Sequence, residues 1–451
     1  MDPLRISEHI ARFVVNTEYF NTNEGDHAEA FCVLRLSLMD WCAVALSGIN
    51  EPVSTIVREQ SLSDGGYEVC HVFGSSQRLP PRSAAMVNGT TSHALDYDDT
   101  HFLHVGHTSV VVFSAAMALA ESESLSGKAF MEASLIGSEV CCYVGNWLGR
   151  SHYEAGFHQT ATAGIFGAVA TASRLLTLDE TQTRHALGIA ATRAAGLTSQ
   201  FGTMSKPYHA GMAASVGVEA AQLASRGFIA NADGIDGTRG FAYTHAAAQN
   251  ESDHPLSLLG EHYVFTDVQH KLHACCHGLH ASIEALEQLK IDHRLTPSDI
   301  NRICIETNPR WLAVCNKLSP STGLESKFSY RHIASLVFSD HNTAALPTYS
   351  DTVCNDPALT RLRDSTEIVS NTQLTDTATR VSLHLSNDSI ISAEYDLAHQ
   401  LPLGIRQEKL LAKCEALLGK QECNRLWTLV SQIEASSTQE FAQSIMSGHS
   451  G

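Results

Sequence analysis

Positive charge is scarce in this sequence. The 451 residues contain 30 lysines and arginines against 48 aspartates and glutamates, which gives a formal net charge of −18. Such a chain is a poor partner for nucleic acid or an acidic membrane surface, because both are themselves negative. An anionic ligand would need a local cluster of positive groups within this field. We therefore expect neither a nucleic-acid partner nor a membrane partner.

Several motifs of well-defined chemistry are also missing. The sequence has no P-loop, GxGxxG turn, HExxH pair or CxxC spacing, and no internal repeat. Its start, "MDPLRISEHIARF", has no long apolar core, so a secretory signal is not expected. The twelve cysteines include two adjacent pairs, Cys141–Cys142 and Cys275–Cys276, and adjacent cysteines rarely form a disulfide or a zinc site. Reduced thiols in a cytoplasmic protein are the simpler interpretation.

The chain is well able to bury a core. Hydrophobic residues make up 43% and charged residues 17%, and the length favours two domains over one. The apolar stretch 28–48 contains Arg35 and Asp40, and its period of 3.6 residues predicts a buried helix rather than a membrane span.

The hydrophobic pattern changes along the chain. Up to about residue 260, helices rich in alanine and glycine are predicted over 108–123, 127–149, 160–176 and 209–227. Alternating residues then predict a strand over 300–309 and a hairpin over 380–398, with a helix over 329–340 between them. After Leu401 the helical pattern returns. We therefore predict a mainly α protein: a large helical domain from both chain ends, residues 1–263 and 401–451, with an inserted smaller α+β domain, residues 264–400.

One stretch concentrates the polar chemistry. "HALDYDDTHFLHVGH", residues 93–107, holds three aspartates and four histidines. Histidine and aspartate are common metal ligands, so a metal-dependent hydrolase is one hypothesis, with Asp98, Asp99, His101 and His104 as the ligands. Without a recognisable ligand frame, an acid–base site without metal is the preferred interpretation, and a polar loop is the remaining one.

The same arrangement occurs at three predicted helix starts. His107 precedes Thr108 and Ser109, which are suitable N-caps, and His158 and Lys206 lie at two other helix starts. A basic group there opposes the helix dipole, so it does not serve helix stability. If these starts converge, their N–H groups and basic side chains would form an anion pocket. A later segment, "KLHACCHGLH", adds Lys271.

Four motifs, "HALDYDDTHFLHVGH", "GFHQTATAGIFGA", "SKPYHAGMAAS" and "KLHACCHGLH", together resemble the MmgE/PrpD family over essentially the whole chain. That family includes cis-aconitate decarboxylase, 2-methylcitrate dehydratase and iminodisuccinate epimerase. The resemblance implies the helical domain, an inserted lid domain, a homodimer, and chemistry on small di- or tricarboxylates without cofactor or metal.

Active-site positions of the decarboxylase branch carry over onto matching residues of this chain. The resemblance implies catalytic roles for Asp96, His107, His158, Lys206 and Lys271, and substrate-binding roles for Thr100, His209, Cys276 and Tyr330. Cys276 is a departure, because animal decarboxylases have a histidine there.

Three reactions fit this set of residues. Decarboxylation, dehydration and epimerisation all begin with a stabilised carbanion next to a carboxylate. We expect His107 to exchange the proton, Asp96 to hold its other nitrogen, and Lys206 and Lys271 to anchor carboxylates, with His101 and His104 on the loop surface. Decarboxylation of cis-aconitate to itaconate is the leading hypothesis. Dehydration of 2-methylcitrate or a similar hydroxy-tricarboxylate, and epimerisation of the iminodisuccinate type, are the alternatives.

Overall fold

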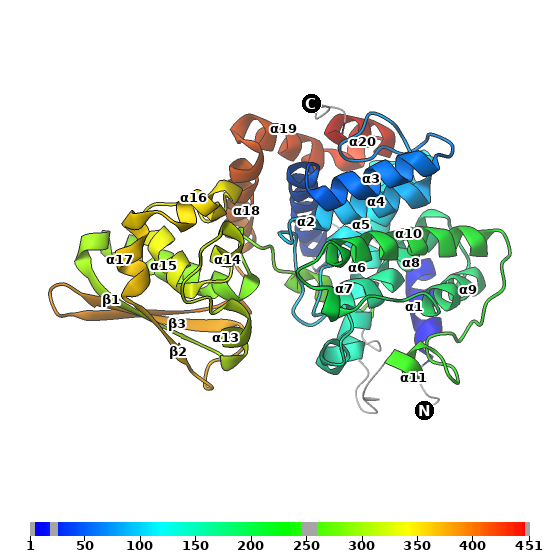
Figure 1. The fold of residues 1–451 in the computed structure, drawn as a ribbon. Helices are drawn as coiled ribbons and strands as arrows, with labels where there is room; N and C mark the ends of the chain where they lie inside the picture. Colours follow the sequence, from blue (N-terminus) through cyan, green and yellow to red (C-terminus); the bar gives the residue numbers. More distant parts are fainter. Residues whose placement is uncertain (1–4, 19–25, 246–258, 447–451) are drawn as a thin grey trace. The chain divides into compact units, whose positions relative to one another are not determined.

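The structure is a computed structural model that describes residues 5–18, 26–245 and 259–446 (Figure 1). The chain forms two compact units, one of Met1–His270 with Gln421–Gly451, the other of Lys271–Lys420. The division made from the sequence placed the corresponding boundaries after residues 263 and 400. Helices predominate, so the protein is mainly α as predicted.

In its described residues the first unit is built of helices joined by loops and has no named strand. The four helices predicted before residue 260 are confirmed with shifted ends, and the third is interrupted at Ala163. The helices of this unit are α1 (Ile6–Asn16), α2 (Asp26–Gly48), α3 (Pro52–Asp64), α4 (Pro81–His93), α5 (Ser109–Ser122), α6 (Gly127–Glu154), α7 (Gln159–Thr162), α8 (Gly164–Leu175), α9 (Glu180–Ala191), α10 (Ser205–Ser225), α11 (Phe241–His245), most of α19 (Lys420–Ser431) and α20 (Thr438–Met446).

Helix α5 lies at the centre of this unit. All of its residues from Ser109 to Glu121 are buried, and it contacts α4, α6, α8 and α10. Helix α2 is long and apolar enough to cross a membrane by length and composition alone, but 78% of that window is buried in the structure. This is the behaviour of a core helix, and it agrees with the buried helix predicted over 28–48.

Small residues let α4 and α10 approach very closely. A Cβ added at Gly89 would lie 2.9 Å from the Cα of Gly211, and one added at Gly211 would lie 2.3 Å from the carbonyl oxygen of Met86. Neither position has room for a side chain, so the two helix backbones meet there. The contact brings the end of α4, at His93, towards the beginning of α10, where Lys206 lies.

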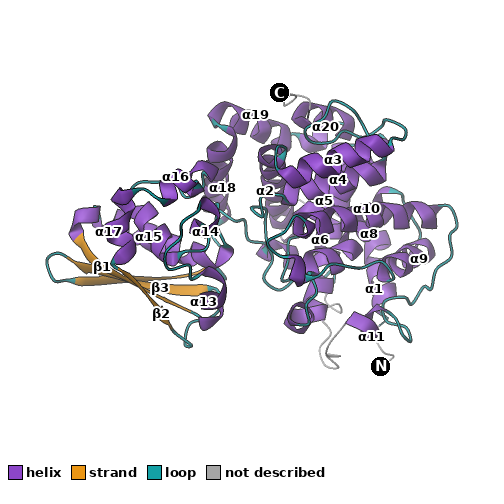
Figure 2. Cartoon of the chain, in the orientation of Figure 1, coloured by secondary structure: helices purple, strands orange, loops and turns teal. Residues whose placement is uncertain are grey.

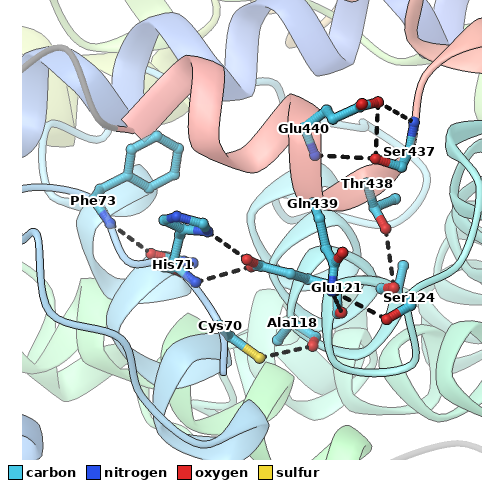
Figure 3. Close-up of polar contacts among 12 residues, drawn as sticks. Cys70, His71, Phe73, Ala118, Glu121, Ser124, Ser437, Thr438, Gln439 and Glu440 are labelled. Atoms are coloured by element: carbon cyan, nitrogen blue, oxygen red, sulfur yellow. Dashed lines mark hydrogen bonds and ion pairs between the residues drawn. The ribbon is translucent and has the colours of Figure 1, made fainter. Parts of the chain in front are cut away.

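The C-terminal helix completes the first unit. The Thr438 hydroxyl donates to the carbonyl oxygens of Ala120 (2.9 Å) and Leu125 (2.7 Å), at the end of α5. The Gln439 amide donates to Ser124 Oγ at 3.0 Å (Figure 3). These contacts show that the helical unit is built from both ends of the chain, as predicted.

The second unit combines a sheet with helices on one face (Figure 2). The strands β1 (Ile300–Thr307), β2 (Thr366–Ser370), β3 (Ala378–Leu385) and β4 (Ile390–Asp396) lie in the order β2-β1-β3-β4. Only β1 and β2 are parallel. The predicted strand and hairpin are thus confirmed. Its helices are α12 (His280–His293), α13 (Pro309–Cys315), α14 (Gly323–Ser326), α15 (Tyr330–Phe338), α16 (Asp351–Cys354), α17 (Pro357–Asp364) and α18 (Leu403–Leu418).

The alternation of buried residues explains this sheet. Ile303 and Ile305 on β1 pair with Leu383 and Val381 on β3, and all four side chains are fully buried. Helices α12, α15 and α17 contact the strands and cover these side chains. The neighbouring residues of each strand are less buried, as the period of two requires.

The close contact of α4 with α10 leads to a stability prediction. Gly211→Ala places a methyl group against Met86 and Thr90, and overpacking of this kind costs roughly 1–3 kcal/mol. We expect a lower Tm by differential scanning calorimetry. Gly404→Ala is the matched control, because a Cβ there meets nothing within 4 Å. Equal Tm values for the two variants would contradict the proposed role of this contact.

Candidate active site

The stretch 93–107 connects α4 with α5 and is irregular. Asp96 and Val105 both have positive φ, 49° and 53°, which marks a tightly folded loop rather than a helix extension. The carboxylate of Asp99 accepts hydrogen bonds from the backbone N–H (3.2 Å) and the hydroxyl of Ser109. Thr108 is the N-cap residue, but its side chain makes no capping bond. Asp99 therefore accepts from a backbone N–H group at the start of α5, which is the capping role that was expected of Thr108 and Ser109.

Asp98 is the centre of the loop. It is fully buried, and each of its carboxylate oxygens faces a different imidazole. Nδ1 of His93 lies 2.9 Å from Oδ1, and Nδ1 of His107 lies 2.8 Å from Oδ2. Both histidines are buried as well. One carboxylate therefore holds two rings.

The pKa shifts assign the protons in this group. Burial by itself would raise the pKa of Asp98, but His107 and His93 outweigh burial and hold that pKa well below its usual range. Burial lowers the pKa of His107 to about 4, although Asp98 acts in the opposite direction. Near neutral pH an ionised Asp98 therefore faces a neutral His107 ring. Because a carboxylate only accepts, the nitrogen that faces it, Nδ1 in both histidines, carries a hydrogen, and in His107 Nε2 carries the lone pair.

The second nitrogen of His107 faces a different pair of charges. Its Nε2 lies 3.3 Å from Oδ1 of Asp96, and the same oxygen is 2.6 Å from Nζ of Lys206. A neutral ring and an ionised Asp96 would present two acceptors to each other. A proton taken up on Nε2 would be shared with Asp96, so this position is built to hold one. The expectation that Asp96 orients His107 is corrected here: Asp98 fixes the tautomer, and Asp96 faces the exchanging nitrogen.

His158 and His209 form the adjoining wall. Their Nδ1 atoms are 3.1 Å apart, and His158 is almost fully buried. Burial and then the charge of Lys206 lower the pKa of His158 well below its usual value. Phe201 lies edge-on to His158, and Nζ of Lys206 lies 5.4 Å from its ring centroid. These contacts join the beginnings of α7 and α10.

A backbone contact ties this wall to the loop. The N–H of His107 donates to Oγ1 of Thr160 at 3.0 Å. The approach depends on Gly106, where an added Cβ would lie 2.8 Å from the Thr160 nitrogen. The helix starts at 107, 158 and 206 therefore converge in the first unit, as the anion-pocket hypothesis required.

His101 and His104 were expected on the loop surface, and that prediction is wrong. Their exposed fractions are 1% and 0%. His101 Nε2 lies 2.8 Å from the carbonyl oxygen of Val264, and His104 Nε2 lies 3.6 Å from Sγ of Cys141. A Cβ added at Gly145 would lie 2.1 Å from the His104 ring, so this glycine makes room for the imidazole. Both residues are packing residues.

The hydrolase hypothesis required four ligands to converge. In the described residues Asp99 binds Ser109, while His101 and His104 point to Val264 and Cys141, so that ligand set is not assembled. A different set, His93, Asp96, Asp98 and His107, has ligand atoms within 4.8 Å of one another. Its chemistry suits a divalent cation, but Nδ1 of each histidine already faces Asp98, and the Lys206 ammonium lies against Asp96.

The remaining predicted residues lie elsewhere. Thr100 pairs through its backbone with Gln269, two residues before Lys271. In the second unit Lys271 is 4% exposed, and its charge acts on Cys275, whose pKa burial raises to about 12. Cys276 is half-buried, and its Sγ lies 3.1 Å from Sγ of Cys315.

Tyr330 is fully buried in the second unit. Its hydroxyl donates to the carbonyl oxygen of Gly278 at 2.8 Å and lies 3.2 Å from Oγ1 of Thr307. The side chain thereby joins the turn that follows Cys276 to strand β1.

The sequence reasoning missed the part played by Asp98 and His93. It assigned Asp98 only to the metal hypothesis and gave His93 no role. A spacing of five residues across the end of a helix has no regular geometry, so it gives no contact signal. The available signal was the mismatch between three closely spaced aspartates and the single cap that α5 needs.

Comparison with known proteins places these motifs in context. Residues 8–252 match the MmgE/PrpD N-terminal domain, and residues 273–435 match the MmgE/PrpD C-terminal domain. The two matches together span most of the chain.

Curated relatives share about a third of their aligned residues with this chain. The cis-aconitate decarboxylase-like protein oryM of Aspergillus oryzae is 32% identical over 270 residues, 56% of each chain. The cis-aconitate decarboxylase of Homo sapiens is 30% identical over 305 residues, 64% of this chain and 62% of its own. That of Aspergillus terreus is 31% identical over 279 residues, 59% and 56%. The chain thus spans less than two thirds of the length of these relatives.

The burial of His104 leads to a prediction on pH. Burial lowers its pKa to about 3, while an unfolded histidine titrates near about 6.5. The stability from neutral His104 is therefore fully present above about pH 6.5 and is lost as the pH falls towards 3. His104→Asn should lower Tm at about pH 7.5 and should reduce the further loss of Tm at about pH 5.5. His399→Asn, at an exposed position, is the control. An unchanged pH dependence in His104→Asn would contradict this assignment.

Proposed function

Because the chain belongs to the MmgE/PrpD family, we propose that it is a lyase of small di- or tricarboxylates, and that its reaction is the decarboxylation of cis-aconitate to itaconate. The names of the curated relatives support this choice of reaction. The observation that carries the proposal is the placement of His107 between two carboxylates and beside Lys206.

Lys206 is the fixed cation in this part of the first unit. Its ammonium pairs with Asp96, and its side chain is only 14% exposed. A substrate carboxylate that enters here replaces water with a charge-assisted hydrogen bond from this group. Because the neighbouring imidazoles are neutral, a trianionic substrate meets little fixed positive charge. The binding of such an anion favours the uptake of protons by these rings.

His107 is the proposed proton donor. Its pKa is about 4, below the value of about 6.5 expected from the sequence, because burial removes water from the ring. A bound tricarboxylate raises the pKa again, and the proton goes to Nε2, the nitrogen that faces Asp96. Asp98 holds Nδ1 throughout, so the ring does not need to turn between uptake and delivery.

The reaction then needs one proton transfer. Loss of carbon dioxide from one carboxylate leaves an electron pair on carbon, spread into the neighbouring unsaturated acid. Nε2 of His107 gives its proton to that carbon, and the carbon–hydrogen bond completes the product. The neutral ring can then take a proton from solvent. No redox change takes place, and the step uses no cofactor.

A homodimer in the cytoplasm belongs to the same proposal. All twelve cysteines lie within the described residues and are free thiols, which suits a reducing compartment.

A substrate screen tests the function directly. Purified protein is incubated with cis-aconitate, 2-methylcitrate, citrate or iminodisuccinate, and the products are followed by NMR. We expect carbon dioxide and itaconate from cis-aconitate, at a rate that a chelator does not change. Loss of water from 2-methylcitrate would replace the proposed reaction with dehydration. Epimerisation of iminodisuccinate would replace it with epimerisation. Activity lost to chelator and restored by Zn²⁺ would favour a metal-dependent enzyme.

The anchoring role of Lys206 predicts a loss of affinity. A charge-assisted hydrogen bond is worth roughly 1.5–3 kcal/mol, so Lys206→Ala should lower kcat/KM by about tenfold to a hundredfold. Wild-type affinity should also weaken with added salt. Lys420→Ala, at an exposed position, should leave the kinetics unchanged. Wild-type kinetics in Lys206→Ala would remove the anion pocket from the proposal.

His107→Asn separates catalysis from packing. Asparagine can still donate to Asp98, but it cannot carry a proton near neutral pH. We expect kcat to fall by roughly 10²-fold or more, with little change in KM or Tm. A purely structural His107 would instead lower Tm and leave the turnover of the folded enzyme intact. Measurements of kcat, KM and Tm on one preparation distinguish the two outcomes.

A further inference from the structure

His93 shares the carboxylate of Asp98 with His107, yet the proposed reaction gives it no part. It is the last residue of α4, and only 1% of it is exposed. Its Nδ1 lies 2.9 Å from Oδ1 of Asp98. Its Nε2 is buried and has no hydrogen-bond partner among the described residues. A hydrogen on Nε2 would be a buried donor without an acceptor, so the hydrogen belongs on Nδ1, where Asp98 accepts it.

We propose that His93 is a positioning residue for the reaction. By occupying Oδ1 of Asp98, it leaves Oδ2 as the oxygen that holds Nδ1 of His107. It acts through Asp98 on the exchanging nitrogen of His107 and transfers no proton itself. This inference rests on the proposed function, because it assigns His93 to the same proton-transfer site.

The geometry of the carboxylate supports this role. A carboxylate with a partner at one oxygen only is less restricted in rotation about its Cβ–Cγ bond than a carboxylate with a partner at each oxygen. Each oxygen of Asp98 lies against a different ring, at 2.9 Å and 2.8 Å, so rotation of the carboxylate would lengthen at least one of the two contacts. Asp98 therefore has a single orientation, and this fixes the orientation of the His107 ring. Misplacement of a catalytic group by about 1 Å can cost on the order of a hundredfold in rate.

The position of His93 is itself strongly constrained. It follows Gly89 by one helical turn, and Gly89 is where α4 meets α10 at Gly211. Its ring lies edge-on to His107, with the centroids 4.5 Å apart, and lies nearly parallel to His158 at 6.2 Å. The α4–α10 contact thus transmits a fixed helix position to the Asp98 carboxylate. A residue held by a helix end, a ring contact and a buried hydrogen bond is well suited to orient a neighbour.

Two substitutions at position 93 separate orientation from packing. In His93→Asn the side-chain amide can take the place of Nδ1–H and still donate to Asp98. In His93→Leu the bulk is retained but the donor is lost. We expect His93→Leu to lower kcat by about tenfold to a hundredfold with KM little changed. His93→Asn should restore most of that kcat.

A matched control comes from another buried histidine–carboxylate pair. Nδ1 of His71 pairs with the carboxylate of Glu121 near the end of α5 (Figure 3). His71→Leu breaks the same kind of contact outside the site. It should lower Tm as His93→Leu does but leave kcat unchanged. The positioning role would be overturned if both leucine variants lost kcat in the same proportion to their loss of Tm. It would also be overturned if the kcat of His93→Asn were no higher than that of His93→Leu.

A spectroscopic readout keeps this test independent of the reaction. Protein labelled with ¹⁵N-histidine gives nitrogen shifts that report which ring nitrogen carries hydrogen, and the His107→Asn spectrum identifies the His107 signals. Without substrate, His107 should hold its hydrogen on Nδ1 in wild type and in His93→Asn, and should show mixed tautomers in His93→Leu. An unchanged His107 tautomer in His93→Leu would overturn the inference. If cis-aconitate proves not to be the substrate, the tautomer measurement still tests the role of His93, because it needs no turnover.

Discussion

The buried carboxylate of Asp98 is the constraint on which the site depends. A charge removed from water must be compensated by polar partners, and each carboxylate oxygen of Asp98 lies within 2.9 Å of an imidazole nitrogen. These contacts keep the carboxylate ionised despite its burial, and an ionised carboxylate in turn favours the tautomer of each ring that places hydrogen on the nitrogen facing it. The nitrogen of His107 that can exchange a proton is therefore directed towards Asp96 and Lys206. The chemistry of the loop follows from this single arrangement.

Close helix packing in the first unit positions the residues of this arrangement. The close contact at Gly89 and Gly211 sets His93 and Lys206 at neighbouring helix ends. Gly106 lets the loop approach the beginning of α7, where Thr160 accepts from the backbone of His107. Glycine costs helix and loop stability when considered alone, and here each glycine removes a side chain that would hold two backbones apart.

Much of this could be predicted from the sequence, because periodicity depends on local chain geometry. The change from a period near 3.6 to a period of two located the sheet, and the repeated small residues indicated close helix packing. The convergence of His107, His158 and Lys206 was the condition of the anion-pocket hypothesis, which rested on their places near three predicted helix starts. The two units, and the use of both chain ends in the helical one, follow from the same pattern.

The partner of each side chain could not be predicted in this way. Asp96, Asp98 and Asp99 lie within four residues of one another, yet Asp96 is exposed, Asp98 is buried between two imidazoles and Asp99 accepts from Ser109 at the start of α5. Their difference arises from backbone dihedrals such as the positive φ of Asp96, for which the sequence has no periodic signal. His101 and His104 resembled surface residues because histidine is polar, and the space for His104 comes from Gly145, which lies on α6.

The most direct measurement concerns Asp98 itself. In Asp98→Asn the amide keeps the size of the carboxylate and can still bond both rings, but its NH₂ group must face an imidazole nitrogen that lacks hydrogen. One histidine is then forced into the other tautomer while the fold is retained. With cis-aconitate as substrate, the variant should keep the wild-type Tm within a few degrees and lose kcat by roughly 10²-fold or more. A folded Asp98→Asn enzyme with the wild-type kcat would contradict the central role of this carboxylate.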